Sequence, residues 1–280
     1  MGREVPVRRP LNERQSRCAV RCLRASAIQW RWVSWAAQAR GVGVLSEEQV
    51  RAYERDGFVL LREALSRDLA DECRSALWER LEEREDDPST WRVPVQRLFA
   101  FDVPVCGEAA TSERWQSAII QLTGPTAAPT PWLGGTVAVR FPIETPPDDD
   151  GWHIDGSYVG PDGQYWANYR SRDRAMLMLV LLSEVGEDDA PTRIRVGSHF
   201  PMIDVLRPFG EDGLSIYGFP FPEHLQDLPL ALATGEPGDV YLCHPFLLHA
   251  AQANRGHRPR FIAQPGVPWR NEGDGFPGAV

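Results

Sequence analysis

Met176-Leu177-Met178-Leu179-Val180-Leu181-Leu182 is an unbroken apolar run with charged segments on both sides. A run of this length, closely followed by Gly and Asp, is typical of a strand buried on both faces. Shorter strand-like stretches, separated by Gly, Pro and Asp, lie around it at residues 136–141, 193–196, 230–233, 239–243 and 261–264. Many short strands separated by turns predict an all-β architecture for the second half of the chain.

The first half has a different character. Ser46-Glu47-Glu48 reads as an N-cap followed by acids, and predicts a helix that ends at Asp56-Gly57. A short strand at residues 58–61, helices at 66–85 and 111–123, and a loop or irregular strand at 91–106 are expected to follow. Helices first and strands afterwards predict a mainly β fold with flanking α: a double-stranded β-helix (jelly roll, cupin-like) buttressed by N-terminal helices.

Composition limits the kind of protein. The hydrophobic content of 42% and charged content of 25% fit a globular chain, and 280 residues suffice for one large β domain. The five Cys lack metal-ligand spacing, so reduced thiols in a cytoplasmic protein are expected. Since no apolar run reaches the roughly 18 residues of a membrane span, no membrane partner is expected.

Charge is divided unevenly along the chain. Residues 1–44 contain nine Arg against two Glu, a balance of +7, whereas the whole chain carries −9, which leaves −16 for residues 45–280. An acidic body argues against nucleic-acid binding. We interpret residues 1–44 as an Arg-rich extension, disordered or the product of a wrongly chosen start codon. Binding of polyanions and a transit-like role remain alternatives for this segment. Residues 45–280 are expected to form the functional domain.

His153-Ile154-Asp155 is the first element of a candidate metal site. Residues i and i+2 of a strand point to the same face, so both side chains can reach one ion. A distant second His would complete a 2-His-1-carboxylate set, the ligands of non-haem Fe(II) oxygenases. The candidates for it are His199, His224, His244, His249 and His257.

Local context favours His249 as the third ligand. It follows a predicted turn and strand and precedes the turn Asn254-Arg255-Gly256. Arg260, 11 residues later, opens the next strand, and a hairpin would bring it near His249. An Arg in that position suits a dicarboxylate co-substrate. Arg258 competes for this role, but its position relative to His249 favours Arg260.

Several motifs occur in one order along residues 45–270: Asp56-Gly57-Phe58-Val59-Leu60, Trp152-His153-Ile154-Asp155, Gly197-Ser198-His199, Gly238-Asp239-Val240, His249, Asn254 and Arg260. In this order the chain resembles the phytanoyl-CoA dioxygenase family of Fe(II)/2-oxoglutarate oxygenases. The resemblance implies that His153, Asp155 and His249 are the iron ligands and that Arg260 anchors the distal carboxylate of 2-oxoglutarate. It also implies that His199 is not a ligand.

Two positions refine this resemblance. Some members place a hydroxyl two residues after the second His to assist the Arg, where this chain has Ala251, and Thr192 is a candidate substitute. Related halogenases lack the carboxylate ligand. Because Asp155 is present in this chain, hydroxylation or another oxidation is favoured over halogenation. Arg140 is expected either to face the pocket or to form a salt bridge at the barrel edge.

The resemblance implies a 2-oxoglutarate-dependent dioxygenase that uses Fe(II) and O2 to oxidise a small organic molecule, releasing succinate and CO2. The alternatives are a jelly-roll metalloprotein that does not use 2-oxoglutarate and a catalytically idle binding protein of the same fold. The loops at residues 142–151, 156–172 and 207–228 contain no phosphate-binding motif, and the absence of Lys argues mildly against CoA thioesters. Trp152, Tyr158, Tyr165 and Trp166 are candidate pocket-lining aromatics, with packing in the core or in loops as an equal alternative.

Overall fold

A capped helix begins the part of the chain that the computed structural model describes, which comprises residues 43–100, 102–128, 133, 135–217, 219 and 221–276. Ser46 and Gln49 form a capping box at the start of α2 (Glu47–Asp56), and Gly57 ends the helix with φ 84°. The predicted N-cap and stop are therefore confirmed. Residues 34–280 group into one compact unit, and the description below concerns that unit. The predicted N-terminal extension lies outside the described residues.

The main sheet has the strand order β1-β10-β6-β12-β3-β2, with β13 also paired to β6. Its strands are antiparallel: β1 (Phe58–Leu61), β2 (Val95–Phe99), β3 (Thr136–Arg140), β6 (Met176–Leu181), β10 (Val240–Cys243), β12 (Arg260–Gln264) and β13 (Gly266–Val267). Every residue of β6 is buried. The apolar run at 176–182 therefore forms a central strand, as predicted.

A second, smaller sheet has the order β11-β7-β9 and consists of β7 (Thr192–Arg195), β9 (Leu230–Ala233) and β11 (His249–Ala250). One apolar cluster joins Leu179, Tyr241 and Ile262 of the main sheet to Ile194 and Ala233 of the small one. The two sheets therefore face each other across a shared interior, and the predicted jelly roll is confirmed. A third sheet pairs β4 (Tyr158–Val159), β5 (Tyr165–Ala167) and β8 (Leu214–Ser215).

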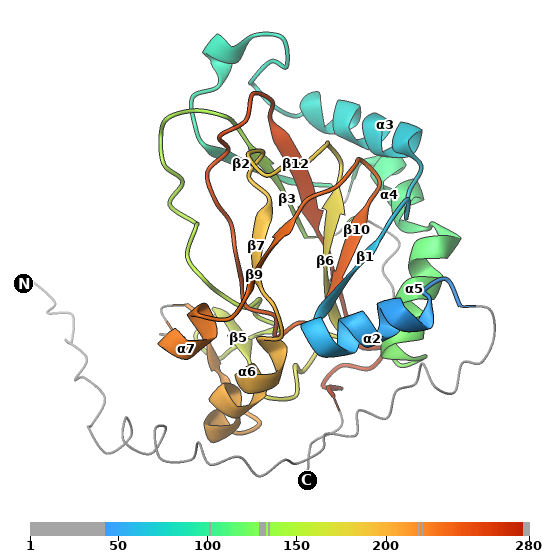
Figure 1. Ribbon diagram of the computed structural model, residues 1–280, viewed down its shortest axis with the longest axis vertical. Coiled ribbons are helices and arrows are strands. Elements are labelled where there is room, and N and C mark those ends of the chain that lie inside the picture. Colours follow the sequence, from blue (N-terminus) through green and yellow to red (C-terminus); the bar gives the residue numbers. More distant parts are fainter. Residues whose placement is uncertain are drawn as a thin grey trace, which may run out of the picture. The chain divides into compact units, whose positions relative to one another are not determined.

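Helices cover the other face of the main sheet. Figure 1 shows α3 (Arg67–Trp78), α4 (Pro104–Ala110) and α5 (Glu113–Thr123) on the side away from β7 and β9. Leu77, Cys106 and Trp115 from these helices join Val139 and Met178 of the sheet in a second apolar cluster. The remaining elements are α6 (His199–Leu206), α7 (Glu223–Gln226) and the 3-10 turns Pro88–Thr90 and Arg207–Phe209.

Two helix predictions were wrong in detail. The helix predicted at 66–85 ends at Trp78, after which three-residue turns follow and Leu81 packs against the core outside any helix. The turns bring the buried Glu83 to Gln96 of β2, which donates a hydrogen bond of 2.9 Å to its carboxylate. The helix predicted at 111–123 begins at Glu113. The stretch 91–106, expected to be a loop or irregular strand, contains β2, and its last three residues begin the helix α4.

Candidate metal centre

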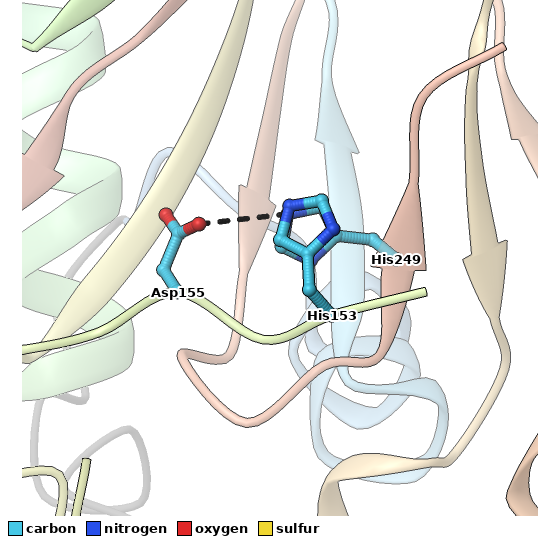
Figure 2. Close-up of side chains that lie close together, drawn as sticks. All are labelled: His153, Asp155 and His249. Carbon is cyan, nitrogen blue, oxygen red and sulfur yellow. Dashed lines mark ion pairs between the residues drawn. The ribbon is translucent and has the colours of Figure 1, made fainter. Parts of the chain in front are cut away.

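The two histidines of the candidate site lie on neighbouring extended segments. His153 forms an isolated antiparallel bridge with His249 of β11, in which each backbone N–H donates to the other residue's carbonyl at 2.9 Å. This pairing sets the imidazole ring centroids 4.4 Å apart, and both rings point toward Asp155 (Figure 2). The prediction that residues 153–155 form a regular strand was wrong, because the ladder is confined to this one bridge.

Hydrogen bonds to the backbone fix which nitrogen of each ring is available. Nδ1 of His153 lies 2.8 Å from the Gly151 carbonyl, and Nδ1 of His249 lies 2.9 Å from the Leu247 carbonyl. A carbonyl only accepts, so each Nδ1 carries the proton and each Nε2 keeps a lone pair. Nε2 of His249 is buried without a hydrogen-bond partner in the described structure and lies 3.7 Å from Asp155 Oδ1. A buried ring nitrogen without a protein partner that faces a carboxylate fits a metal-binding position.

Asp155 supplies the third candidate ligand atom, and one ligand atom from each of His153, Asp155 and His249 lies within 4.8 Å of the others. Its second oxygen, Oδ2, accepts a hydrogen bond of 2.8 Å from Nη1 of Arg174. Burial tends to raise the pKa of Asp155, but the charge of Arg174, then those of His249 and His153, outweigh it and lower the pKa below its usual value. The carboxylate is therefore ionised and ready to bind a cation.

Burial, and next the neighbouring His153, lower the pKa of His249 to about 4, against the opposing effect of Asp155. The imidazole is therefore neutral at neutral pH. Two imidazoles and one carboxylate form a donor set typical of Fe(II) in oxygenases.

Trp152 connects the ligand segment to the small sheet. The guanidinium carbon of Arg195 lies 4.4 Å from the Trp152 ring centroid, and that of Arg193 lies 5.1 Å away. Arg193 also donates to the Asp150 and Ala251 carbonyls at 2.6 and 2.7 Å. Residues on both sides of the His153–His249 bridge are thereby fixed to β7. This tryptophan, predicted as a pocket-lining candidate, instead contacts two arginines.

Two buried arginines lie side by side on neighbouring strands of the main sheet. Arg260 of β12 is in register with Arg140 of β3, and each is 3% exposed. Arg140 donates to Asp149 at 2.6 Å, and Asp149 also binds Arg97. Arg140 therefore forms the expected salt bridge. It shares the inner side of the sheet with Arg260, because residues directly opposite in a ladder project to the same side.

Arg260 is the less compensated of the two arginines. Burial, and then the charge of Arg140, lower its pKa to about 9, against the opposing charge of Asp149. Its Nε has no hydrogen-bond partner within the described part of the chain, as is also true of Nε and Nη1 of Arg140, but Arg140 has the ion pair with Asp149. A buried guanidinium in this state is poised to bind an anion. Arg258, the competing candidate, is exposed and pairs with Glu184 at 2.8 Å.

The hairpin predicted between His249 and Arg260 was wrong. β11 pairs with β7 in the small sheet, whereas β12 pairs with β3 and β6 in the main sheet. The intervening segment therefore crosses from one sheet to the other. Buried Asn254 fixes this crossing by donating to the Arg140 carbonyl at 2.9 Å and the Arg258 carbonyl at 2.8 Å. Thr192 is buried on β7 in register with Ala233, and its proposed contact with a co-substrate stays a prediction.

The remaining candidate histidines lie apart from the metal ligands. His199 is buried, and its Nε2 lies 3.2 Å from the Glu54 carbonyl. Gly57 passes so close that an added Cβ would lie 2.5 Å from Nδ1 of His199. This contact explains why the two motifs Asp56-Gly57-Phe58 and Gly197-Ser198-His199 occur together. His224 and His257 are exposed.

A cleft of about 490 Å³ opens beside the ligand segment. Its lining includes Tyr158, Arg172, Asp173, Trp269 and Glu272, and Arg172 lies over the Tyr158 ring at 3.6 Å. Tyr158 is three residues beyond Asp155, at most about 11 Å along an extended chain. The cleft therefore begins close in sequence to Asp155, and none of the three candidate metal ligands lines it.

Sequence reasoning missed two charged residues of the site. Arg174 bonds to Asp155, and Asp149 bonds to Arg140. Neither residue has a motif spacing that sets it apart from the many other arginines and acids. Only their contacts in the folded structure identify them as residues of the site. In the described part of the chain, no helix has both the length and the apolar character needed to cross a membrane.

Comparison with known proteins supports the same assignment. A family model described as phytanoyl-CoA dioxygenase (PhyH) matches residues 53–262. An ectoine dioxygenase of Bordetella bronchiseptica is 26% identical over 242 residues, covering 77% of this chain and 73% of the relative. A second ectoine dioxygenase, from Bordetella parapertussis, matches to the same extent.

Solved structures show the same fold. The apo form of EctD from S. alaskensis is similar with a TM-score of 0.57 and 21% identity, covering 82% of this chain and 78% of that one. The non-heme alpha ketoglutarate dependent carbocyclase SnoK from nogalamycin biosynthesis is similar with a TM-score of 0.58 and 19% identity, covering 84% and 95%. The family model spans most of the chain, and the metal-ligand set is intact. The protein belongs to the phytanoyl-CoA dioxygenase family of Fe(II)- and 2-oxoglutarate-dependent oxygenases, as its motif order predicted.

Proposed function

We propose that this protein oxidises a small organic molecule at an Fe(II) ion held by His153, Asp155 and His249, with 2-oxoglutarate as co-substrate. The observation that carries the proposal is the convergence of two ring nitrogens and one carboxylate oxygen within 4.8 Å, with both Nδ1 protons committed to backbone carbonyls. This arrangement leaves both Nε2 lone pairs free to bind the ion.

Arg260 is proposed to bind the distal carboxylate of 2-oxoglutarate. It is a buried cation with an unused donor, and the neighbouring charge of Arg140 makes an additional anion favourable there. Asp149 already neutralises the charge of Arg140, so the carboxylate of 2-oxoglutarate would pair mainly with Arg260. Thr192, buried on the facing small sheet, is proposed to donate a hydroxyl hydrogen bond to the same co-substrate.

When bound, the iron and 2-oxoglutarate together couple the reduction of O2 to the release of succinate and CO2 and to oxidation of the substrate. The protein's own residues have the tasks of binding and exclusion. His249 presents a neutral imidazole that is buried from water, His153 presents a second imidazole, and Asp155 presents an ionised carboxylate.

The size of the cleft supports a small substrate. A volume of about 490 Å³ is in the usual range for small-molecule sites. Its lining mixes charged and aromatic side chains with the aliphatic Val159 and Pro268. Ectoine dioxygenases are among the relatives of this chain, which makes ectoine a rational first compound to test. The buried free thiols Cys73, Cys106 and Cys243 support a reducing compartment such as the cytoplasm.

The first experiment is anaerobic titration of the metal-free protein with Fe(II) and 2-oxoglutarate, observed by visible absorption. We expect a metal-to-ligand charge-transfer band that requires both components and is absent in His153→Ala. Iron binding without any band in the wild-type protein would show that 2-oxoglutarate does not chelate the iron. No iron binding at all would exclude the ligand set.

The role of Arg260 is tested in the same titration with a matched pair of variants. Arg260→Ala should weaken 2-oxoglutarate binding by roughly 30-fold to 1,000-fold, since loss of one partner of a buried charge pair costs about 2–4 kcal/mol. Arg258→Ala removes an exposed arginine two residues away and should leave this affinity unchanged within about twofold. Equal effects of the two substitutions would contradict the assignment.

A further inference from the structure

The two oxygens of Asp155 have different partners. Oδ1 lies 3.7 Å from Nε2 of His249, on the side where the three ligand atoms converge. Oδ2 accepts the 2.8 Å hydrogen bond from Arg174, whose side chain is 20% exposed. A charge-assisted hydrogen bond of this length is strong and directional. The carboxylate is thereby held with one oxygen toward the candidate metal position and the other bound to the protein.

The loop that presents Arg174 is itself rigidly built. The side-chain oxygen of buried Asn168 accepts from the backbone N–H groups of Arg170 and Arg172, both at 3.1 Å. The hydroxyl of Ser171 donates to the Arg174 carbonyl at 2.9 Å. Ser171 and Asp173 adopt positive φ of 48° and 68°, a conformation that non-glycine residues hold only when the surroundings require it.

Gly266 provides the space that the guanidinium occupies. A Cβ at this position would lie 3.3 Å from Cζ and 3.4 Å from Nε of Arg174. The neighbouring residue 267 accepts a backbone hydrogen bond of 2.7 Å from Ala175, which follows the arginine. Strand β13 and the loop therefore enclose the Arg174 side chain from two sides, and its bond to Asp155 is one of few directions left to it.

We propose that Arg174 is a positioning residue that restricts Asp155 to binding the metal through a single oxygen. The inference rests on the proposed function. An octahedral ion with three protein ligands keeps three positions, two for the chelating 2-oxoglutarate and one for O2. If Asp155 bound through both oxygens, it would occupy one of these three positions. The Arg174 hydrogen bond makes Oδ2 unavailable and thereby keeps the position open.

The test compares four variants by metal affinity and by the charge-transfer band formed with 2-oxoglutarate. Arg174→Gln removes the charge, Arg174→Lys restores a cation, and Gly266→Ala crowds the guanidinium without removing it. Arg67→Gln is the control, because it breaks an exposed ion pair of 2.9 Å with Glu236. Circular dichroism and thermal unfolding verify that each variant is folded.

We expect Arg174→Gln to retain metal but to bind 2-oxoglutarate about 10- to 100-fold more weakly, the usual effect of removing a group that orients a metal ligand. The band should also change in position, because the coordination of the iron changes. Arg174→Lys should recover most of the affinity, Gly266→Ala should be intermediate, and Arg67→Gln should match wild type.

A band of unchanged position and a 2-oxoglutarate affinity within twofold of wild type in Arg174→Gln would overturn the inference. If that variant does not fold, the same two measurements on Gly266→Ala test the inference: an unchanged band and an unchanged affinity for 2-oxoglutarate would overturn it. A wild-type protein that forms no band overturns the proposed function and the inference together. A wild-type band that is lost in His153→Ala and unchanged in Arg174→Gln overturns the inference alone.

Discussion

Two pairs of neighbouring histidines lie in this protein, and only one of them resembles a metal site. The rings of His153 and His249 are 4.4 Å apart, and those of His199 and His244 are 5.0 Å apart. In the first pair, Nε2 of each ring faces the carboxylate of Asp155. In the second pair, His199 bonds to the Glu54 carbonyl, and His244 accepts from the Phe246 N–H and stacks on Phe276.

The difference teaches that proximity of imidazoles is not sufficient for a metal centre. Each pair contains buried rings, and the pKa values of His199, His244 and His249 are all lowered, mainly by burial. What separates the pairs is the direction of the nitrogens and the presence of Asp155 as a third ligand. Among the described residues, only His153, Asp155 and His249 form such a converging group.

The largest expected difference between the pairs is in metal affinity. His153→Ala should weaken Fe(II) or Co(II) binding by about 1,000-fold or more, since even loss of a group that merely orients a ligand costs 10- to 100-fold. His244→Ala should reduce the free energy of unfolding and leave metal affinity unchanged within about threefold. Calorimetric titration of each variant measures this, and a comparable loss in His244→Ala would place a ligand in the second pair.

Crowding the second pair should affect stability rather than metal binding. Gly57→Ala forces a Cβ into a left-handed backbone and against His199 and Leu247, so we expect a loss of about 3 kcal/mol in the free energy of unfolding. Gly163→Ala is the control, because its φ is also positive but nothing lies within 4 Å, and about 1 kcal/mol is expected. Equal losses in urea unfolding would mean that the His199 contact contributes nothing.

The second pair should also make stability depend on pH. Burial lowers the pKa of His199 to about 4. The unfolded chain, with a His pKa near 6.5, then binds more protons between these two values, and stability falls as the pH falls. From pH 7 to pH 5 this residue should account for a loss of about 2 kcal/mol.

His199→Gln should lack this part of the pH dependence, which urea unfolding at the two pH values measures. Besides burial, the charge of His199 contributes to the lowered pKa of His244, so the difference between wild type and variant measures His199 together with its effect on His244. An unchanged difference in unfolding free energy between pH 7 and pH 5 would show that His199 does not titrate in this range.

The smallest expected effect concerns the attachment of the first pair to its sheet. Trp152→Leu removes two contacts with arginines, each worth about 0.5–1 kcal/mol, so we expect a loss of about 1 kcal/mol in the free energy of unfolding. Metal affinity should fall by less than about tenfold. A loss as large as that of His153→Ala would indicate that Trp152 determines the ligand geometry itself.

The residues of the candidate metal site could be proposed from sequence because their chemistry is local and distinctive. A His and an Asp two positions apart, with a second His after a predicted strand, form a pattern that the motif order makes specific for a metal site. The central strand was predictable because every residue of the run 176–181 is apolar and buried. In both cases the signal lies in neighbouring residues.

Other features depend on contacts between distant residues and were not predictable. The segment from His249 to Arg260 changes sheets, although its length and turn residues equally suit a hairpin. Arg174 and Asp149 acquire their roles from what lies opposite them. The helix α3 ends at Trp78, and the turns that follow place Glu83 against Gln96 of β2, whereas the helical spacing of Leu81 continues past that end.

The bridge between His153 and His249 has a consequence for the lifetime of the protein. The two residues are 96 positions apart in the chain, so the complete ligand set exists only after that long loop has closed. A metal ion that binds the native state alone stabilises it by about 2.7 kcal/mol at a concentration 100 times its dissociation constant. The supply of iron should therefore govern how long a newly made chain resists unfolding and proteolysis.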